Sequence, residues 1–235
     1  MAGYDIRRPA LPDMVSHLFF FNGGNGVTVF FAISGFLITL TSLRRFGSLS
    51  EMRPVTFYRI RFARIAPLLV SIVTVLSGLA LVRAQGFQFS HTMAPLWRAV
   101  VAVFTFHSNW LEARYGFLPA NWNVMWSLSV EEMFYLFFPL TCVALLRLRR
   151  GIILFVAFLL AFVVMGPFAR TLWSNNEIWL EQSYLGGMDC IALGCITALI
   201  THSVECHKSG FMNPTKRRFL GALQFIGWSL ILLIA

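Results

Sequence analysis

The chain has 235 residues, of which 57% are apolar and only 12% are charged, and its formal net charge is +9. Soluble domains carry about 25% charged residues, so this composition excludes an ordinary soluble domain. A positive charge of this size on a soluble chain would indicate a nucleic-acid partner. Here the arginines cluster in short segments between apolar runs, which is typical of membrane proteins, so we expect the lipid bilayer and no nucleic acid as a partner.

Six apolar stretches are long enough to cross a bilayer as helices, which takes about 17–25 residues when short spans stand upright. They are residues 26–43, 65–82, 126–146, 151–168, 184–201 and 219–235. A further stretch, residues 93–106, is short and is interrupted by Pro95 and Arg98, so we expect a half-span or an interfacial helix there. The sequence therefore predicts an all-α fold, a polytopic transmembrane helical bundle with about six spans.

The basic residues indicate how these spans are oriented. Three segments between spans are rich in arginine and lysine, namely residues 44–64, 147–150 and 202–218. If residues 93–106 do not cross, all three segments fall on one side of the membrane. The positive-inside rule makes that side cytoplasmic and places the amino terminus outside.

Both ends of the chain look unusual for a complete protein of this kind. Residues 1–18 contain Asp5, Arg7, Arg8 and Asp13 but no apolar core, so we do not expect them to form a cleavable signal peptide. The last expected span runs to Ala235. We therefore expect residues 1–235 to be a single integral-membrane domain that is incomplete and lacks helices at both ends.

Two adjacent carboxylates, Glu131 and Glu132, lie inside the apolar stretch 126–146. A charged side chain at the centre of a bilayer costs roughly 2.5–3.5 kcal/mol on insertion scales, so such residues generally serve a function. Because successive helical residues point about 100° apart, at most one of the two faces a given cavity squarely. A carboxylate there can orient a histidine or accept a hydroxyl proton, and Glu131 is the better candidate. Alternatively, Ser129 and Glu132 form a capping box at the start of the helix.

Arg61 and Arg64 are three residues apart and therefore lie on one helix face, at the cytoplasmic end of the expected span 65–82. Guanidinium groups bind phosphates through paired hydrogen bonds. The alternative is that both arginines are ordinary anchors at the lipid headgroups. Arg59 points to another face.

Other polar residues within or beside the spans have simpler interpretations. Ser34 and Gly35 are small, and their default role is to let two helices approach closely. Asp189 lies in a span and needs an arginine or a neighbouring helix as a partner. His107 and Asn109 precede an expected outer loop, where they could meet an acceptor molecule. His202, Cys206 and His207 lack a second ligand pair at zinc spacing, so we expect no metal site.

Three sequence blocks together resemble a known family. They are GVTVFFAISGFLIT at 26–39, YRIRFARIAP at 58–67 and WSLSVEEMFYLFFP at 126–139, and a later block, YLGGMDCIALGCITALI, follows at 184–200. In order and spacing these blocks resemble those of the membrane-bound acyltransferase family 3, over about residues 22–201. Members of this family O-acylate sugars of lipopolysaccharide, peptidoglycan and similar acceptors.

The resemblance implies an enzyme of the bacterial inner membrane. It would transfer an acyl group, with acetyl as the expected one, from cytoplasmic acyl-CoA to a hydroxyl of a carbohydrate or glycolipid acceptor. Acetyl-CoA would be a co-substrate, and no permanently bound cofactor is implied. The resemblance assigns Arg61 and Arg64 to the donor and places the segment of Ser34 near it. We add Arg59 to the expected donor residues, and the intramembrane carboxylates Glu131 and Glu132 are the expected catalytic residues.

The chain also departs from the family pattern. The first family helix, which carries an arginine and an essential histidine, is not recognisable, and Asn123 stands where many relatives have a histidine. Two alternatives therefore stay open. A transporter or lipid flippase would also need carboxylates and interrupted helices within the membrane, although the chain shows no inverted repeat. An inactive, truncated acyltransferase is the other alternative.

Overall fold

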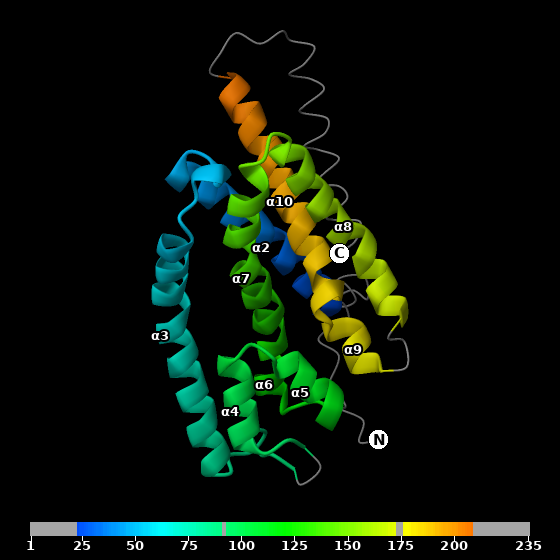
Figure 1. Ribbon diagram of the computed structural model, residues 1–235. Coiled ribbons are helices and arrows are strands. Elements are labelled where there is room, and N and C mark those ends of the chain that lie inside the picture. Colours follow the sequence, from blue (N-terminus) through cyan, green and yellow to red (C-terminus); the bar gives the residue numbers. More distant parts are fainter. Residues whose placement is uncertain (1–22, 91–92, 173–175, 209–235) are drawn as a thin grey trace, which may run out of the picture.

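The computed structural model describes residues 23–90, 93–172 and 176–208, and within these ranges every regular element is a helix. Five helices are long and apolar enough to cross a membrane, which confirms the expected all-α, polytopic bundle (Figure 1). They include α2 (Gly23–Phe46), α3 (Pro54–Leu81), α7 (Met125–Leu146), α8 (Gly151–Leu172) and α10 (Tyr184–Lys208). The sixth expected span, residues 219–235, lies outside the described residues.

Helices α2 and α10 pack against each other through glycines. A Cβ atom added at Gly35 would collide with the backbone carbonyl of Ile191, and one added at Gly194 would collide with that of Ala32. Without a hydrophobic driving force between helices in lipid, such close approach is what holds membrane helices together. The packing role expected for the segment around Ser34 and Gly35 is therefore confirmed.

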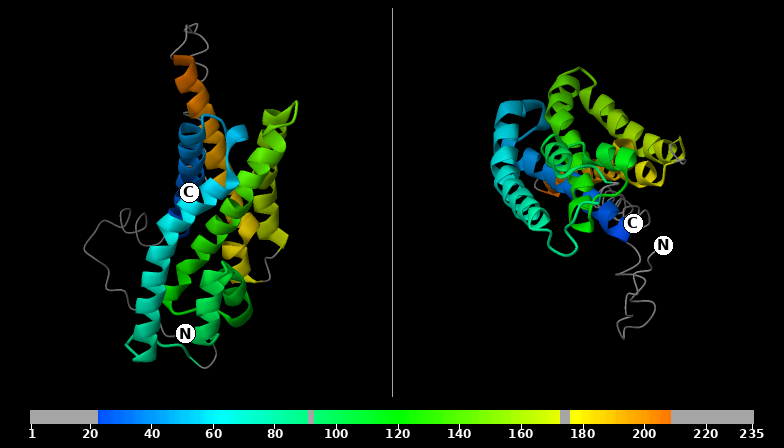
Figure 2. Two further views of the ribbon diagram at one scale, coloured as in Figure 1. Left: turned by 60° about the vertical axis from the view of Figure 1, so that its left-hand side comes forward. Right: turned by 90° about the horizontal axis from the view of Figure 1, so that it is seen from below.

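Helix α3 lies at the rim of the bundle, as the view from below in Figure 2 shows. It begins at Pro54 rather than near residue 65, because proline fits the first position of a helix and nothing before Pro67 interrupts the turns. Arg61 and Arg64 consequently lie within α3, on a helix as their spacing predicted. Leu69 and Val73 are the buried residues that anchor α3 against the short helices.

The short helices gather at one end of the molecule, the lower end in Figure 1. They are α4 (Leu96–Phe104), α5 (Ser108–Tyr115), α6 (Ala120–Asn123) and α9 (Glu177–Gln182). Helix α4 has nine residues, too few to cross, in agreement with the half-span expected at 93–106. Residues 110–125, expected as an open loop, instead contain most of α5 and all of α6 packed around buried Trp122.

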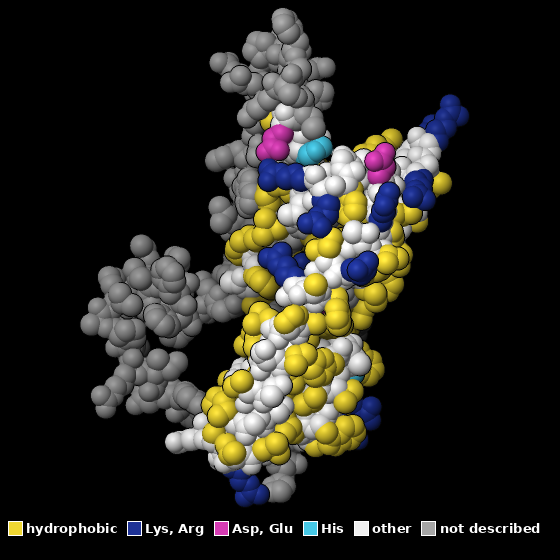
Figure 3. All heavy atoms as spheres, turned by 90° about the vertical axis from the view of Figure 1, so that its left-hand side faces the viewer, with side chains coloured by type: hydrophobic (Ala, Val, Ile, Leu, Met, Phe, Trp, Pro, Cys, Tyr) yellow, Lys and Arg dark blue, Asp and Glu magenta, His cyan; other side chains and the backbone are white. Residues whose placement is uncertain are grey.

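The basic segments meet at the opposite end. Arg44 of α2 lies 3.8 Å from Glu205 of α10, and Arg147 after α7 donates to the carbonyl of Ser50 in the 3-10 helix η2 (Leu49–Glu51). Figure 3, which faces α3, shows basic side chains gathered where α2 ends and α3 begins, above a mostly apolar surface. The described parts of the three basic segments thus lie at one end, as a membrane orientation by charge requires.

Candidate active site

The centre of the candidate site is Arg61, which reaches from α3 to α7. Its Nε lies 3.4 Å from Oε1 of Glu132, and its Cζ lies 3.6 Å from the ring centroid of Tyr135. The Arg61 and Glu132 side chains are only 18% and 11% exposed. This ion pair and cation–π stack form a strong, well-shielded contact between α3 and α7.

Glu132 does not form the capping box that Ser129 suggested. Helix α7 begins one turn earlier, at Met125, so both residues lie inside the helix and Val124 precedes it without a side-chain cap. Glu132 pairs with Arg61 instead, and the buried Ser129 hydroxyl lies 2.7 Å from the hydroxyl of Ser108 on α5. The capping interpretation was therefore wrong.

Glu131 faces a different space. It is 4% exposed and lines a cavity of about 560 Å³ between α2, α3 and α7, together with Ser34, Arg61, Arg64 and Tyr135. Below we call this space the central cavity. The Ser34 side chain is a close polar neighbour of the Glu131 carboxylate. One carboxylate oxygen, Oε1 of Glu131, is buried without a hydrogen-bond partner among the described residues.

Glu132 lines a second space, a groove of about 420 Å³ between α3, α4 and α7. Its walls are mostly apolar and include exposed Phe62 and Phe104. We call it the lateral groove. Arg61 and Tyr135 line both spaces and so stand between them. The two adjacent carboxylates face two different spaces, as the 100° step between helical neighbours predicts.

A third space, the basic pocket, lies between α2 and α3 and has a volume of about 170 Å³. Arg45, Arg61 and Arg64 line it together with the hydroxyl residues Thr41 and Ser42. It shares four lining residues with the central cavity, namely Ile38, Thr41, Arg61 and Arg64, so the two spaces adjoin. Of the expected donor residues, Ser34, Arg61 and Arg64 are thus brought together.

Arg59 is not part of this group. It lies on the exposed side of α3 and lines neither the central cavity, the lateral groove nor the basic pocket. Its place follows from helix geometry, since Arg59 is two residues before Arg61 and points about 200° away from it. Tyr135, by contrast, was missed, although it lies four residues after Glu131 and hence on the same face of α7.

Glu112 is a buried carboxylate on the short helix α5, and the sequence did not single it out. With the amide of Asn123 turned so that its nitrogen faces Glu112, that nitrogen donates to the two carboxylate oxygens at 3.2 and 2.6 Å. Gln182 and the backbone of Leu118 also hydrogen-bond with Glu112. Burial nevertheless raises the pKa of Glu112 to about 7, because it disfavours the charged form.

This polar network includes one residue expected to meet the acceptor. Asn109 is fully buried, and its side-chain nitrogen donates to the carbonyl of Gln182 at 3.1 Å. Asn109 therefore joins α5 to α9 and is not available to an acceptor, so that expectation was wrong. His107 is half-buried, and its Nδ1 lies 2.6 Å from the hydroxyl of Thr105.

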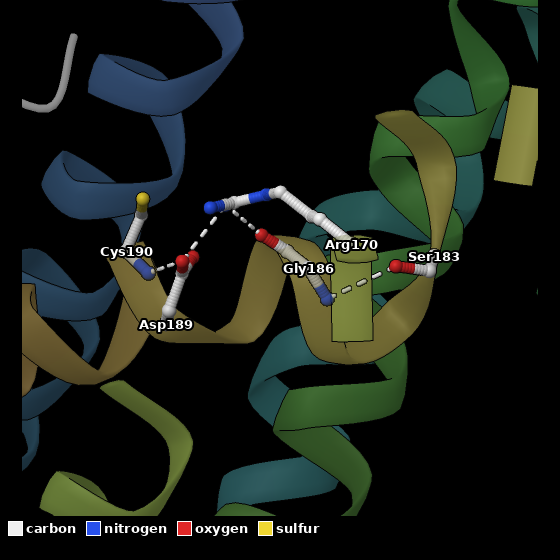
Figure 4. A network of polar contacts seen from close by, with 5 residues as sticks. All are labelled: Arg170, Ser183, Gly186, Asp189 and Cys190. Atoms are coloured by element: carbon white, nitrogen blue, oxygen red, sulfur yellow. Dashed lines mark hydrogen bonds and ion pairs between the residues drawn. The ribbon is translucent and has the colours of Figure 1, made fainter. Parts of the chain in front are cut away.

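Asp189 has the arginine partner that its place in a span predicts (Figure 4). Arg170 at the end of α8 donates to Oδ2 of Asp189 at 2.8 Å and to the carbonyl of Gly186. The backbone N–H of Cys190 donates to the other oxygen of Asp189 at 2.6 Å. With both oxygens engaged, Asp189 ties α8 to α10 and is a structural residue.

A metal site is not evident in the part of the chain that the structure describes. No three His, Cys, Asp or Glu side chains lie together there. The segment His202, Cys206 and His207 lies only partly within the residues whose side chains are described.

The fold and the site define a polytopic helical membrane protein with arginines and carboxylates gathered inside it. The sequence profile of a family described as "Acyltransferase domain" matches residues 4–234. The chain therefore belongs to this family, the membrane-bound acyltransferase family 3, as its sequence blocks indicated.

Curated relatives come from Staphylococcus aureus. The chain is 27% identical over 185 residues to "O-acetyltransferase OatA" of strain NCTC 8325, a match that covers 74% of this chain and 30% of the relative. It is 29% identical over 129 residues to "Putative O-acetyltransferase SACOL0978" of strain COL, covering 52% of this chain and 20% of the relative. The chain thus spans less than a third of the length of these relatives. No solved structure matches it.

Proposed function

We propose that the chain is the membrane-embedded part of an O-acyltransferase. It would move an acyl group, with acetyl as the expected group, from cytoplasmic acyl-CoA to a hydroxyl of a carbohydrate or glycolipid acceptor, in the bacterial inner membrane. Family membership and the names of the relatives support this proposal.

The observation that carries the proposal is that the basic pocket adjoins the central cavity. Arg61 and Arg64 line both spaces, and Glu131 lines the inner one. Phosphates of acyl-CoA would bind the guanidinium groups, and the thioester would extend between α2 and α7 toward Ser34 and Glu131. Water is largely excluded there, so each polar contact with a reacting group is strengthened.

The transfer itself needs a proton acceptor. The acceptor oxygen attacks the thioester carbon, its proton leaves to a base, and the carbon–sulfur bond breaks to release the thiol of coenzyme A. The family resemblance implies a histidine base, but no described histidine lines the central cavity. Glu131 is the carboxylate in that cavity, and its partnerless oxygen is placed to accept the proton or to orient such a base.

The test is donor binding by the full chain in detergent, measured by calorimetry with acetyl-CoA. Saturable binding is expected for the parent, and the change Arg61→Ala with Arg64→Ala should abolish it. Arg59→Ala is the matched control, because Arg59 is on the same helix but outside the three spaces. Arg64→Ala alone is included because Arg61→Ala also leaves Glu132 without its ion pair. No binding by the parent, or equal loss in Arg59→Ala, would contradict the proposal.

A further inference from the structure

Two neighbouring arginines at the end of α2 have different surroundings. Arg44 faces α10, where its Nη2 lies 3.8 Å from Oε2 of Glu205, and both side chains are largely exposed. Arg45, one residue on, points to the other side and lines the basic pocket with Arg61 and Arg64. The positive-inside rule gives Arg44 and Arg45 the same role in membrane orientation, so it does not explain why only Arg45 lines the basic pocket.

The basic pocket has an excess of positive charge. Three guanidinium groups line it, and none of its lining residues is acidic. Arg61 has Glu132 on its far side, but neither Arg45 nor Arg64 has an ion-pair partner among the described residues. Ser42 adds a hydroxyl group to the same walls, whereas the Thr41 hydroxyl there donates to the carbonyl of Leu37. An arrangement of forked cationic donors and a hydroxyl without a counter-charge is suited to a polyvalent anion, and above all to phosphate.

The size of the pocket narrows the choice of anion. Its volume of about 170 Å³ is less than a third of the 560 Å³ of the central cavity. Such a space suits a compact anion such as a diphosphate, and a nucleotide bound there would extend out of it.

The distance to the carboxylate in the central cavity also fits a diphosphate. Ser34, which neighbours Glu131, lies eleven residues before Arg45 on α2, which is about 16 Å at ~1.5 Å per residue. The arm of coenzyme A between its diphosphate and its sulfur has a backbone about as long as four extended residues, roughly 14 Å at ~3.5 Å per residue. A diphosphate at Arg45 would therefore bring the thioester to Ser34 and Glu131.

We infer that Arg45 is a third phosphate ligand of the donor site, and that with Arg61 and Arg64 it holds the diphosphate of acyl-CoA rather than its 3′-phosphate. This inference rests on the proposed function and adds a binding residue and a specific part of the donor to it. The nucleoside with its 3′-phosphate then lies outside the pocket, on the side of the basic segments.

The experiment compares two donors and two variants of the full chain in detergent. Acetyl-CoA and acetyl-dephospho-CoA both contain the diphosphate, and only the first carries the 3′-phosphate. Loss of a charge-assisted hydrogen bond raises a dissociation constant by about tenfold or more. Arg45→Ala should therefore weaken the binding of both donors, and by the same factor. Arg44→Ala, which removes the same charge one residue away, should leave both affinities unchanged. Arg45 has no partner to lose, so unchanged thermal unfolding would show that the variant is folded.

Each other outcome decides against the inference in its own way. If Arg45→Ala behaves like Arg44→Ala while the Arg61 and Arg64 double variant loses binding, the role of Arg45 is wrong and the proposed function stands. If Arg45→Ala weakens acetyl-CoA but not acetyl-dephospho-CoA, the assignment to the diphosphate is wrong. If the parent binds neither donor, both this inference and the proposed function are overturned.

Discussion

Glu131 and Glu132 are neighbours in the sequence but not in their surroundings. Glu131 lies in the central cavity with one partnerless oxygen, whereas Glu132 is engaged by Arg61. A free acceptor oxygen beside a substrate space suits a chemical role, and an ion pair suits the positioning of the arginine. The two residues should therefore fail in different ways when they are changed.

We expect Glu131→Gln to leave donor binding within about twofold of the parent and to lower the rate of acyl transfer by about a hundredfold or more, since the amide cannot accept the proton. Glu132→Gln should instead weaken donor binding, because Arg61 loses the carboxylate that holds it. Donor titration and acetyl incorporation into envelope carbohydrate measure the two effects. Equal loss of donor binding in both variants would show that Glu131 has no separate role.

Glu112 makes stability depend on pH. Its pKa of about 7 in the folded chain is above its ordinary value of 4.5, so its contribution is complete below pH 4.5 and is lost as the pH rises through 7. At about 1.4 kcal/mol per pKa unit, the loss amounts to a few kcal/mol at most. The parent should therefore unfold at a lower temperature at pH 8 than at pH 5.

The matched variant is Glu112→Gln, which keeps the shape of the side chain but cannot ionise. Its melting temperature should fall less than that of the parent between pH 5 and pH 8. Thermal unfolding in one detergent across this range is the measurement. An equal pH dependence in the two chains would mean that Glu112 does not ionise in this range.

For single residues, the spacing in the sequence predicted several members of the site but not the contacts between them. The spacing of Arg61 and Arg64 predicted one helix face, and the apolar surroundings of Glu131 marked it as functional. The contacts of Arg61 with Glu132 and Tyr135 join segments more than 70 residues apart, and no local pattern encodes such a pairing. Glu112 was hidden for the same reason, since its partners Asn123 and Gln182 come from two other short helices.

Among the elements, the seam between α2 and α10 depends on the absence of side chains. We expect Gly194→Leu to lower the free energy of unfolding by more than the usual 1–3 kcal/mol of overpacking, because the new Cβ meets backbone, which cannot move aside. Gly78→Ala is the control, as a Cβ there on α3 meets nothing within 4 Å. Thermal unfolding in detergent should show a large loss for the first and none for the second. Similar stability of both variants would contradict the close packing.

Long apolar elements were predictable, and short or mixed ones were not. Hydropathy located the central parts of α2, α7, α8 and α10, because a run of about 20 apolar residues indicates a transmembrane helix. It placed the start of α3 too late, since its first turns carry arginines. The helices α5, α6 and α9 have no strong apolar period, and buried contacts around Trp122 and Gln182 hold them, so composition suggested loops.

For the whole molecule, the orientation can be tested with single cysteines. Arg149 lies in the basic turn between α7 and α8, and Gln88 follows α3 at the opposite end, and both are exposed. In a chain with Cys206→Ser, Arg149→Cys should react with an impermeant maleimide only in opened cells, and Gln88→Cys in intact cells. The other free cysteines, Cys142, Cys190 and Cys195, are buried. The reverse labelling pattern would mean that the orientation is opposite to the expected one. Labelling of both positions in intact cells would mean that α7 does not place them on opposite sides of the membrane.

The stack of Arg61 on Tyr135 has a consequence for the molecule as a whole. Together with Ile65 and Leu69, these two residues line both the central cavity, which holds arginines and a carboxylate, and the lateral groove, whose lining includes exposed Phe62 and Phe104. Arg61 therefore carries its charge between an apolar groove and a space that holds the Glu131 carboxylate. In the proposed acyltransferase, the stack would keep lipid tails in the lateral groove apart from Glu131 and the reacting thioester.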